Sequence, residues 1–436
     1  MEQLLFTGAF LAVLFFLLGS GVWVGLSLLG VALTGMTLFT TRPAGDAMMT
    51  QVWAMSSSWS LTALPLFIWM GEILFRSRLS ENLFKGLAPW LGRLPGGLLH
   101  VNVAGCALFA AISGSSVATV ATVGKMSIPE LRRRNYPENL IVGTLAGAGT
   151  LGLLIPPSII LIVYGVTVNE SIAQLFMAGI LPGIMIALLF SGYIAGVGYL
   201  RRAELPQPEA GRALLDRLRD SLQLIPVVLL ILAVLGSIYS GIATATEAAV
   251  LGVVGGLILS AAQGSLSAKS FVEGLMGATR TSCMIALILA GSAFLTLAMG
   301  FTGLPRQLAA WIAHLELSPL ALIVALTLFY IVLGCFLDGI SAVVLTMAVV
   351  EPMIRQAGID LIWFGIFLVI VVEMAQITPP VGFNLFVLQG MTGHDMAFIA
   401  RAAMPLFFAM VLAVAIIVMW PELATWLPEQ MRHRPG

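Results

Sequence analysis

Two short stretches of this sequence place helix-breaking residues inside apolar segments. Residues 143–161 read GTLAGAGTLGLLIPPSIIL, and residues 373–386 read EMAQITPPVGFNLF. Each Pro-Pro pair would stop an α-helix, leaving carbonyl oxygens on one side of the break and N–H groups on the other. In hydrocarbon each such group costs several kcal/mol unless something satisfies it. A dehydrated Na⁺ could satisfy the carbonyls and a carboxylate the N–H groups, so the pattern predicts ion binding at two broken helices.

The composition indicates that the whole chain lies in a membrane. Of 436 residues, 59% are hydrophobic and 10% charged, whereas a soluble domain has about 25% charged residues. The formal net charge of zero gives no reason to expect nucleic acid. Three scattered cysteines without CxxC spacing favour neither disulfides nor a metal site. No HExxH motif or nucleophile–base pair supports a membrane-embedded enzyme, and the acidic start of the chain does not resemble a cleaved signal peptide.

The apolar runs predict ten spans and two re-entrant hairpins. The spans are expected at about 4–19, 21–40, 61–75, 139–167, 172–199, 222–240, 244–262, 283–299, 361–388 and 399–420. Residues 98–123 and 319–350 are apolar runs interrupted by SGSS and DGIS. Non-helical backbone at membrane depth survives only where protein or a cavity surrounds it, which favours hairpins.

The charges of the loops predict the orientation. With the N-terminus outside, 16 of the 21 Lys and Arg fall in inside loops, as the positive-inside rule requires. Five spans separate the hairpins, so they enter from opposite faces. Gly114 and Gly339 differ by 225 positions, and Pro156 and Pro379 by 223. This recurrence with opposite topology predicts an inverted repeat, and therefore an all-α polytopic membrane protein with two re-entrant hairpins and two broken helices.

The repeat also predicts how the chain is divided. The expected parts are scaffold helices (1–75), a first transport half (76–167), scaffold helices with a cytoplasmic linker at 201–221 (168–282), a second transport half (283–420) and a periplasmic tail (421–436).

Hydroxyl and carbonyl oxygens at the tips and breaks could hold cations without burying a net charge. The first cation site is predicted at Ser113, Gly114, Ser115, Ser116, Gly147, Gly149, Thr150, Gly152 and Pro156. The second is predicted at Asp338, Gly339, Ser341, Gln376, Thr378 and Pro379. Substrate contacts are predicted at Ser115, Ser116, Ser341 and Asn384. Asn384 could also be purely structural.

Some of these residues also have a simpler, purely structural interpretation. A single Pro-Pro pair in a membrane helix is more often a kink than a site, but two matching pairs, each with a polar hairpin tip, favour a site. Asp338 could hold a cation or cap a helix. Glu247 is expected to lie at a helix start capped by Thr246. Glu72 and Glu373 lie in apolar spans and have no assigned role.

Five motifs form a recognisable set across both halves: AISGSSVATVATVGKMSIPELRRR (111–134), LIPPSIILIVYGVTVNESIAQLFMAGILPG (154–183), GIATATEAAV (241–250), FLDGISAVVLT (336–346) and ITPPVGFNLFVLQGMTG (377–393). In this combination the sequence resembles the large membrane subunit (DctM-like) of tripartite ATP-independent periplasmic (TRAP) transporters. Ala245 and Ala348 stand where that family often has proline, which leaves the stiffness of these loops open.

The resemblance implies more than the spacing does. It implies an elevator-type secondary transporter in the bacterial inner membrane, with both termini periplasmic, that imports an organic acid coupled to Na⁺. The substrate class would be a C4-dicarboxylate, sialic, keto or sugar acid. The implied partners are a small four-helix membrane subunit and a periplasmic substrate-binding protein, with no cofactor besides Na⁺. The alternative is a stand-alone dicarboxylate symporter, driven by Na⁺ or H⁺, that needs no binding protein.

Overall fold

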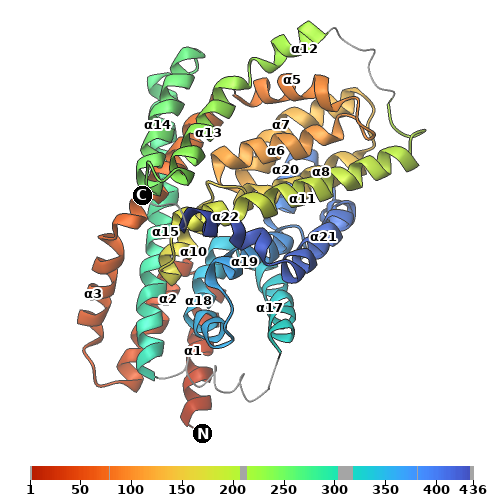
Figure 1. Ribbon diagram of the computed structural model, residues 1–436. Helices are drawn as coiled ribbons and strands as arrows, with labels where there is room; N and C mark the ends of the chain where they lie inside the picture. Colours follow the sequence, from red (N-terminus) through yellow and green to blue (C-terminus); the bar gives the residue numbers. More distant parts are fainter. Residues whose placement is uncertain (1, 78, 207–213, 303–317, 381, 433–436) are drawn as a thin grey trace.

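The fold consists of helices throughout the described part of the chain, with no strand there. The computed structural model describes residues 2–77, 79–206, 214–302, 318–380 and 382–432. The expected all-α membrane architecture is thus confirmed, and Figure 1 shows two groups of helices.

In the first group, α2, α3, α14 and α15 stand upright on the left of Figure 1. The long helix α15 packs along α2, α3 and α4, while α14 packs on α4 and α13. These helices are α1 (Glu2–Gly19), α2 (Val24–Phe39), α3 (Ala44–Ser56), α4 (Ala63–Phe75), α13 (Ile225–Tyr239), α14 (Ala245–Ala262) and α15 (Ala268–Thr302), with a 3₁₀ turn η1 (Trp59–Thr62) before α4. Helix α14 begins with a capping box formed by Thr244 and Glu247, so the expected cap at Thr246 is wrong: Thr244 is extended, whereas Thr246 lies inside the first turn.

The second group contains both repeats. The first comprises α6 (Leu99–Ser113), α7 (Ser116–Arg133), α8 (Glu138–Gly149), α9 (Leu151–Leu154), α10 (Ile159–Val168) and α11 (Ile172–Leu200). The second comprises α17 (Pro319–Gly334), α18 (Gly339–Gln356), α19 (Leu361–Gln376), α20 (Phe383–Thr392) and α21 (Met396–Met419). The hairpins are thus α6–α7 and α17–α18, and the second arm of each runs past its predicted end at 123 or 350.

The packing of these helices repeats in mirrored fashion. Within each repeat both hairpin arms pack on the first part of the broken helix, α6 and α7 on α8, and α17 and α18 on α19. Between repeats, α10 packs on α18 as α20 packs on α7, and α11 packs on α19 as α21 packs on α8. The first hairpin lies in the upper half of Figure 1 and the second in the lower half. The fold is therefore an inverted-topology repeat whose two halves are interlocked.

Helix α19 lies at the centre of this group. Its sequence, LIWFGIFLVIVVEMAQ, is apolar on all sides apart from Glu373 and Gln376, and every residue in it is buried. A helix that is hydrophobic all round belongs in a core.

Five of the described helices are long and apolar enough to cross a membrane: α11, α14, α15, α18 and α21. Counting two bent pairs as single spans raises the number to seven; these pairs are α3 with η1–α4, bent by 55°, and α8–α9 with α10, bent by 41°. Five shorter apolar helices of 10–17 residues, among them α2 and α19, also lie in the described part of the chain.

Some predicted boundaries fall elsewhere in the structure. The predicted span at 283–299 is part of the continuous α15, so the proposed boundary between residues 282 and 283 lies inside a helix. Ser292 of α15 also donates a hydrogen bond to the Val344 carbonyl of α18 (2.7 Å), so this helix contacts both groups. The division into scaffold and transport halves stays a prediction.

Three amphipathic helices, α5 (Leu79–Leu91), α12 (Leu214–Ser221) and α22 (Glu422–Arg432), complete the described chain. Helix α12 occupies the end of the predicted linker and packs on α5 at the top of Figure 1; residues 207–213 of the linker lie outside the described residues. Helix α22 occupies most of the predicted C-terminal tail and packs on α11.

Candidate functional site

The tip of the first hairpin is a two-residue turn stabilised by its own hydroxyls. Gly114 ends α6 in the left-handed conformation (φ 58°), and Ser115 caps α7 by accepting a hydrogen bond from the Ala118 N–H. The Ser113 and Thr119 hydroxyls lie 2.9 Å apart, and Thr119 Oγ1 also donates to the Ser115 carbonyl (2.7 Å). These hydrogen bonds hold the tip in a defined shape.

This tip packs directly against the first break. The Ile159 N–H donates to the Gly114 carbonyl (3.4 Å). A Cβ on Gly152 would lie 2.6 Å from Cα of Ser116 and 2.7 Å from the Ser115 carbonyl oxygen. A Cβ on Gly114 would lie 2.8 Å from the Pro157 carbonyl oxygen. Only glycine fits at these two positions.

Two members of the predicted first cation site face elsewhere. A Cβ on Gly147 would meet the Leu406 side chain of α21, and the Thr150 hydroxyl donates to the Gly147 carbonyl (2.6 Å) and lies 3.6 Å from Met410 Sδ on α21. The structure thus brings Gly114, Ser115, Ser116 and Gly152 together at the break but places Gly147 and Thr150 beside α21.

Ser158 belongs to the first break, and the sequence prediction missed it. Its hydroxyl donates to the Leu153 carbonyl and accepts from the Leu161 N–H (3.4 Å), so it caps α10. A serine between a proline and an apolar run is an N-cap signal that could have identified it.

The second hairpin tip meets the second break in a similar way. The Asp338 carboxylate accepts a hydrogen bond from the Ser341 N–H (3.1 Å), so Asp338 caps α18, one of its two predicted roles. Cys335 Sγ donates to the Pro379 carbonyl (3.3 Å). A Cβ on Gly339 would lie 2.9 Å from Val372 Cγ1 of α19. Ser341 is buried.

The second break turns two carbonyls towards one point. Gly382 is left-handed (φ 46°), and a Cβ there would lie 3.0 Å from the carbonyl oxygens of both Gln376 and Thr378. The Thr378 hydroxyl donates to the Met374 carbonyl (2.7 Å). Both Pro-Pro bonds, Pro156–Pro157 and Pro379–Pro380, are cis.

Buried polar atoms without partners gather around the second break. Among the described residues, Gln376 Nε2 and both amide atoms of Asn384 are buried and lack a hydrogen-bond partner. Asn384 is fully buried on α20, and its Nδ2 lies 3.6 Å from the position of a Cβ on Gly149. This predicted substrate residue of the second repeat therefore reaches the broken helix of the first. Buried amides are normally paired, so these atoms are suited to a ligand.

Glu373 joins the two repeats, a role that the sequence did not reveal. It is fully buried on α19, and its Oε1 accepts a hydrogen bond from Ser116 Oγ (2.7 Å). Its Oε2 has no partner among the described residues. An intramembrane acid is a functional signal, but its partner lies 257 positions away.

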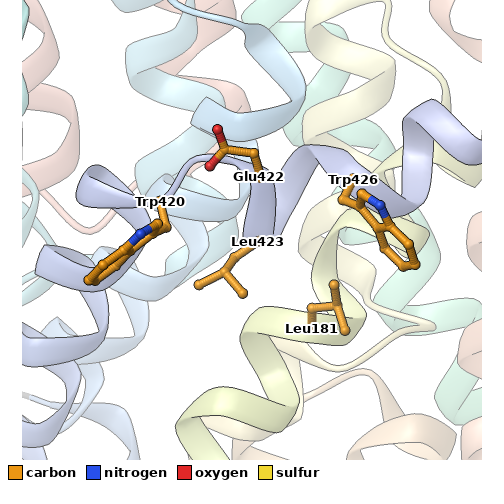
Figure 2. A pocket seen from close by; sticks show the side chains of 5 residues that line it. All are labelled: Leu181, Trp420, Glu422, Leu423 and Trp426. Carbon is orange, nitrogen blue, oxygen red and sulfur yellow. The ribbon is translucent and has the colours of Figure 1, made fainter.

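A shallow depression of about 390 Å³ lies elsewhere, between α11 and α22. Figure 2 shows Trp420 and Trp426 on either side of Leu423, above Leu181. None of the predicted site residues lines it.

Comparisons with known proteins agree with the architecture. The family model described as tripartite ATP-independent periplasmic transporter, DctM component, matches residues 11–423. The C4-dicarboxylate TRAP transporter large permease protein DctM of Pseudomonas aeruginosa is 31% identical over 374 residues, covering 86% of this chain and 87% of that protein. The ectoine/5-hydroxyectoine TRAP transporter large permease protein UehC of Ruegeria pomeroyi is 30% identical over 403 residues, covering 90% and 91%.

A longer relative and a solved structure extend this picture. The isethionate TRAP transporter permease protein DctMQ of Oleidesulfovibrio alaskensis is 31% identical over 405 residues, which cover 93% of this chain and 63% of that protein. The crystal structure of the YdaH transporter of Alcanivorax borkumensis has a similar fold, with a TM-score of 0.60, 14% identity and 88% of each chain covered. The chain therefore belongs to the DctM component family of tripartite ATP-independent periplasmic transporters, and is a membrane transporter subunit.

Proposed function

We propose that this chain is the large permease of a Na⁺-coupled importer of an organic acid anion. The observation that carries the proposal is that each helix break is covered by the tip of a hairpin, through Gly114 and Ile159 in one half and Cys335 and Pro379 in the other. Broken backbone at membrane depth needs protein or a cavity around it, and a hairpin tip can supply that cover in one state and withdraw it in another, as a transport site requires.

The chemistry of the breaks suits a small hard cation. The carbonyls of Gln376 and Thr378 converge at Gly382, and serine hydroxyls surround the first tip. Oxygen ligands without net charge can replace the hydration shell of Na⁺. One cation at each break, with the predicted ligands, would hold the neighbouring tip in place.

The substrate anion would lie between the two tips. Helices α7, α18 and α20 begin near this region, and helix N-termini favour a carboxylate. The unpaired amides of Asn384 and Gln376 supply further N–H donors. C4-dicarboxylates and ectoine, the substrates named for two relatives, both carry a carboxylate, which could accept hydrogen bonds from these donors.

The transport cycle would follow an elevator mechanism. The predicted transport halves, residues 76–167 and 283–420, would move as a unit against the predicted scaffold helices, in the inner membrane, with both termini periplasmic. A periplasmic binding protein would deliver the substrate, and a small membrane subunit would complete the complex. The longer DctMQ relative, of which this chain spans 63%, supports a second subunit.

The test is uptake of radiolabelled organic acids into proteoliposomes under a Na⁺ gradient, with and without the binding protein and the small subunit. Ser115→Ala and Thr378→Ala should each weaken the apparent affinity for Na⁺ by at least about 5-fold, the effect of losing an interaction of about 1 kcal/mol.

Thr34→Ala is the matched control. Thr34 also lies in an apolar helix and donates to the carbonyl four residues earlier (2.8 Å), as Thr378 does, but far from either break. If both test variants kept wild-type uptake and Na⁺ dependence, the site assignment would be wrong. Uptake by the purified chain alone would support the stand-alone symporter instead.

A further inference from the structure

We propose that the Ser116–Glu373 hydrogen bond couples the two breaks, so that a cation bound at one strengthens binding at the other. Glu373 is a positioning residue in this proposal, which rests on the proposed Na⁺ coupling. The bond joins the hairpin tip of one repeat to the broken helix of the other.

The side chain of Glu373 is enclosed by protein. Every residue of α19 is buried, and Glu373 itself is fully buried. A polar group in such a place costs free energy unless it is hydrogen-bonded. The Ser116 hydroxyl, at 2.7 Å, supplies that bond, so the position of the tip is tied to the side chain of Glu373.

The first end of this link reaches the first break. Ser116 is the first residue of α7, directly after the tip, and its backbone lies against Gly152 of α9. A Cβ at Gly152 would come within 2.7 Å of Ser116 N and of the Ser115 carbonyl oxygen. The tip is therefore packed between Gly152 on one side and Glu373 on the other.

The second end reaches the second break within one helical turn. Gln376, the last residue of α19, lies three residues after Glu373, and the Thr378 hydroxyl bonds back to the Met374 carbonyl. The carbonyls of Gln376 and Thr378 are those that converge at Gly382. Because α19 is continuous over this turn, a shift of Glu373 moves the candidate ligands of the second cation.

Such a link has a thermodynamic consequence. If a cation at one break strengthens binding at the other, the second cation must strengthen binding at the first by the same factor. One intramolecular hydrogen bond changes an equilibrium by about 5-fold. Breaking the bond at Ser116 should therefore weaken cation binding at the distant second break by about that factor.

Cys335 offers a local reporter of the second break, because its thiol contacts the Pro379 carbonyl. Cys283 is exposed and would be replaced by serine, whereas Cys106 is fully buried; Cys335 is only 6% exposed, so its modification would report movement of the second tip away from the break. The rate of modification of Cys335 by methyl methanethiosulfonate would be measured against Na⁺ concentration in the purified chain, with K⁺ keeping the ionic strength constant.

Ser116→Ala and Glu373→Leu break the bond from opposite ends. Each should raise the Na⁺ concentration that half-protects Cys335 by about 5-fold, and the double variant should be no worse than either single one. Glu373→Gln keeps an oxygen that accepts from Ser116 and should restore the wild-type value. Met374→Leu, a volume-conserving change at the next position of α19, is the control for packing.

The outcomes separate this inference from the proposed function. If Na⁺ does not protect Cys335 in the wild-type chain, the proposed cation site at the second break is refuted. If Na⁺ protects Cys335 but Ser116→Ala leaves the midpoint unchanged, the coupling is refuted while the site stands. A Glu373→Gln variant that behaves like Glu373→Leu would also refute coupling through the Ser116–Glu373 hydrogen bond. Ser116→Ala keeps the test valid if Glu373→Leu does not fold.

Discussion

The replacement of Gly152 by alanine tests the contact between the first tip and the first break. A Cβ at this position would lie 2.6 Å from Cα of Ser116, and ordinary contact begins at 3.4 Å. The hairpin tip must therefore move by about 0.8 Å, the difference between these two distances. A shift of that size would disturb the Ser116–Glu373 hydrogen bond, because its oxygens lie 2.7 Å apart and an O–H···O hydrogen bond tolerates only about 2.5–3.0 Å.

The expected effect is on cation affinity more than on folding. Overpacking of this kind costs about 1–3 kcal/mol, which corresponds to a roughly 5- to 150-fold weaker apparent affinity for Na⁺ if the closed tip holds the cation. Alanine is also the better helix former by about 0.5–1 kcal/mol. This higher helix propensity stabilises α9 equally whether the tip lies against the break or away from it. It therefore offsets part of the loss in the free energy of unfolding but none of the loss in Na⁺ affinity.

The assay is Na⁺-dependent uptake in proteoliposomes, together with the thermal midpoint of the detergent-solubilised chain. Gly390→Ala is the control, because a Cβ there meets nothing within 4 Å. It should keep wild-type Na⁺ dependence and raise the midpoint slightly. A Gly152→Ala protein with wild-type Na⁺ dependence would refute the reasoning, since the tip would then not need its observed position.

Three further changes have expected outcomes. Gly382→Ala should impair uptake at least about 5-fold, because it forces alanine into a left-handed conformation at a cost of about 1–2 kcal/mol and against two carbonyl oxygens; normal uptake would exclude a role for their convergence. Thr244→Ala should lower the free energy of unfolding by about 1 kcal/mol without changing Na⁺ dependence, because it removes the capping box of α14; an unchanged chemical-denaturation midpoint would contradict this. Burial would raise the pKa of the Glu130 carboxyl, but hydrogen bonds from Arg134 and Arg133 bring that pKa below its usual range. The ion pairs of Glu130 should therefore stabilise the fold fully above about pH 4.3, the usual pKa of a glutamate. This stabilisation should decline as the pH falls through the lowered pKa. Glu130→Gln should flatten that acid-side decline in thermal midpoint, and an identical pH profile would count against the ion pairs.

The sequence predicted the parts of the site that depend on local chemistry. The Pro-Pro pairs, the SGSS and DGIS tips and their opposite topology follow from residue types and spacing, and the structure shows helix breaks and hairpin turns there. Gly114 and Gly382 adopt left-handed backbone, which glycine allows without steric cost, but this conformation was not predicted.

The parts that depend on packing between distant segments could not be predicted. Nothing near Thr150 in the sequence indicates that its hydroxyl lies beside Met410. Glu373 had no assigned role because Ser116 lies in the other repeat. Helices α3, α5 and α22 were not predicted as well-defined elements, since their shorter, mixed sequences lack the continuous apolar run that identifies a span.

The crosswise packing of α10 on α18 and of α7 on α20 also constrains how the protein is made. The first polar break stays uncovered on one side until the second repeat has been synthesised. The ribosome must add 224 residues between the end of α10 at Val168 and the end of α20 at Thr392, which takes roughly 10–45 s at 5–20 residues per second. During that interval the first Pro-Pro segment must stay beside water or the insertion machinery, so α10 is expected to enter the bilayer only late in biogenesis.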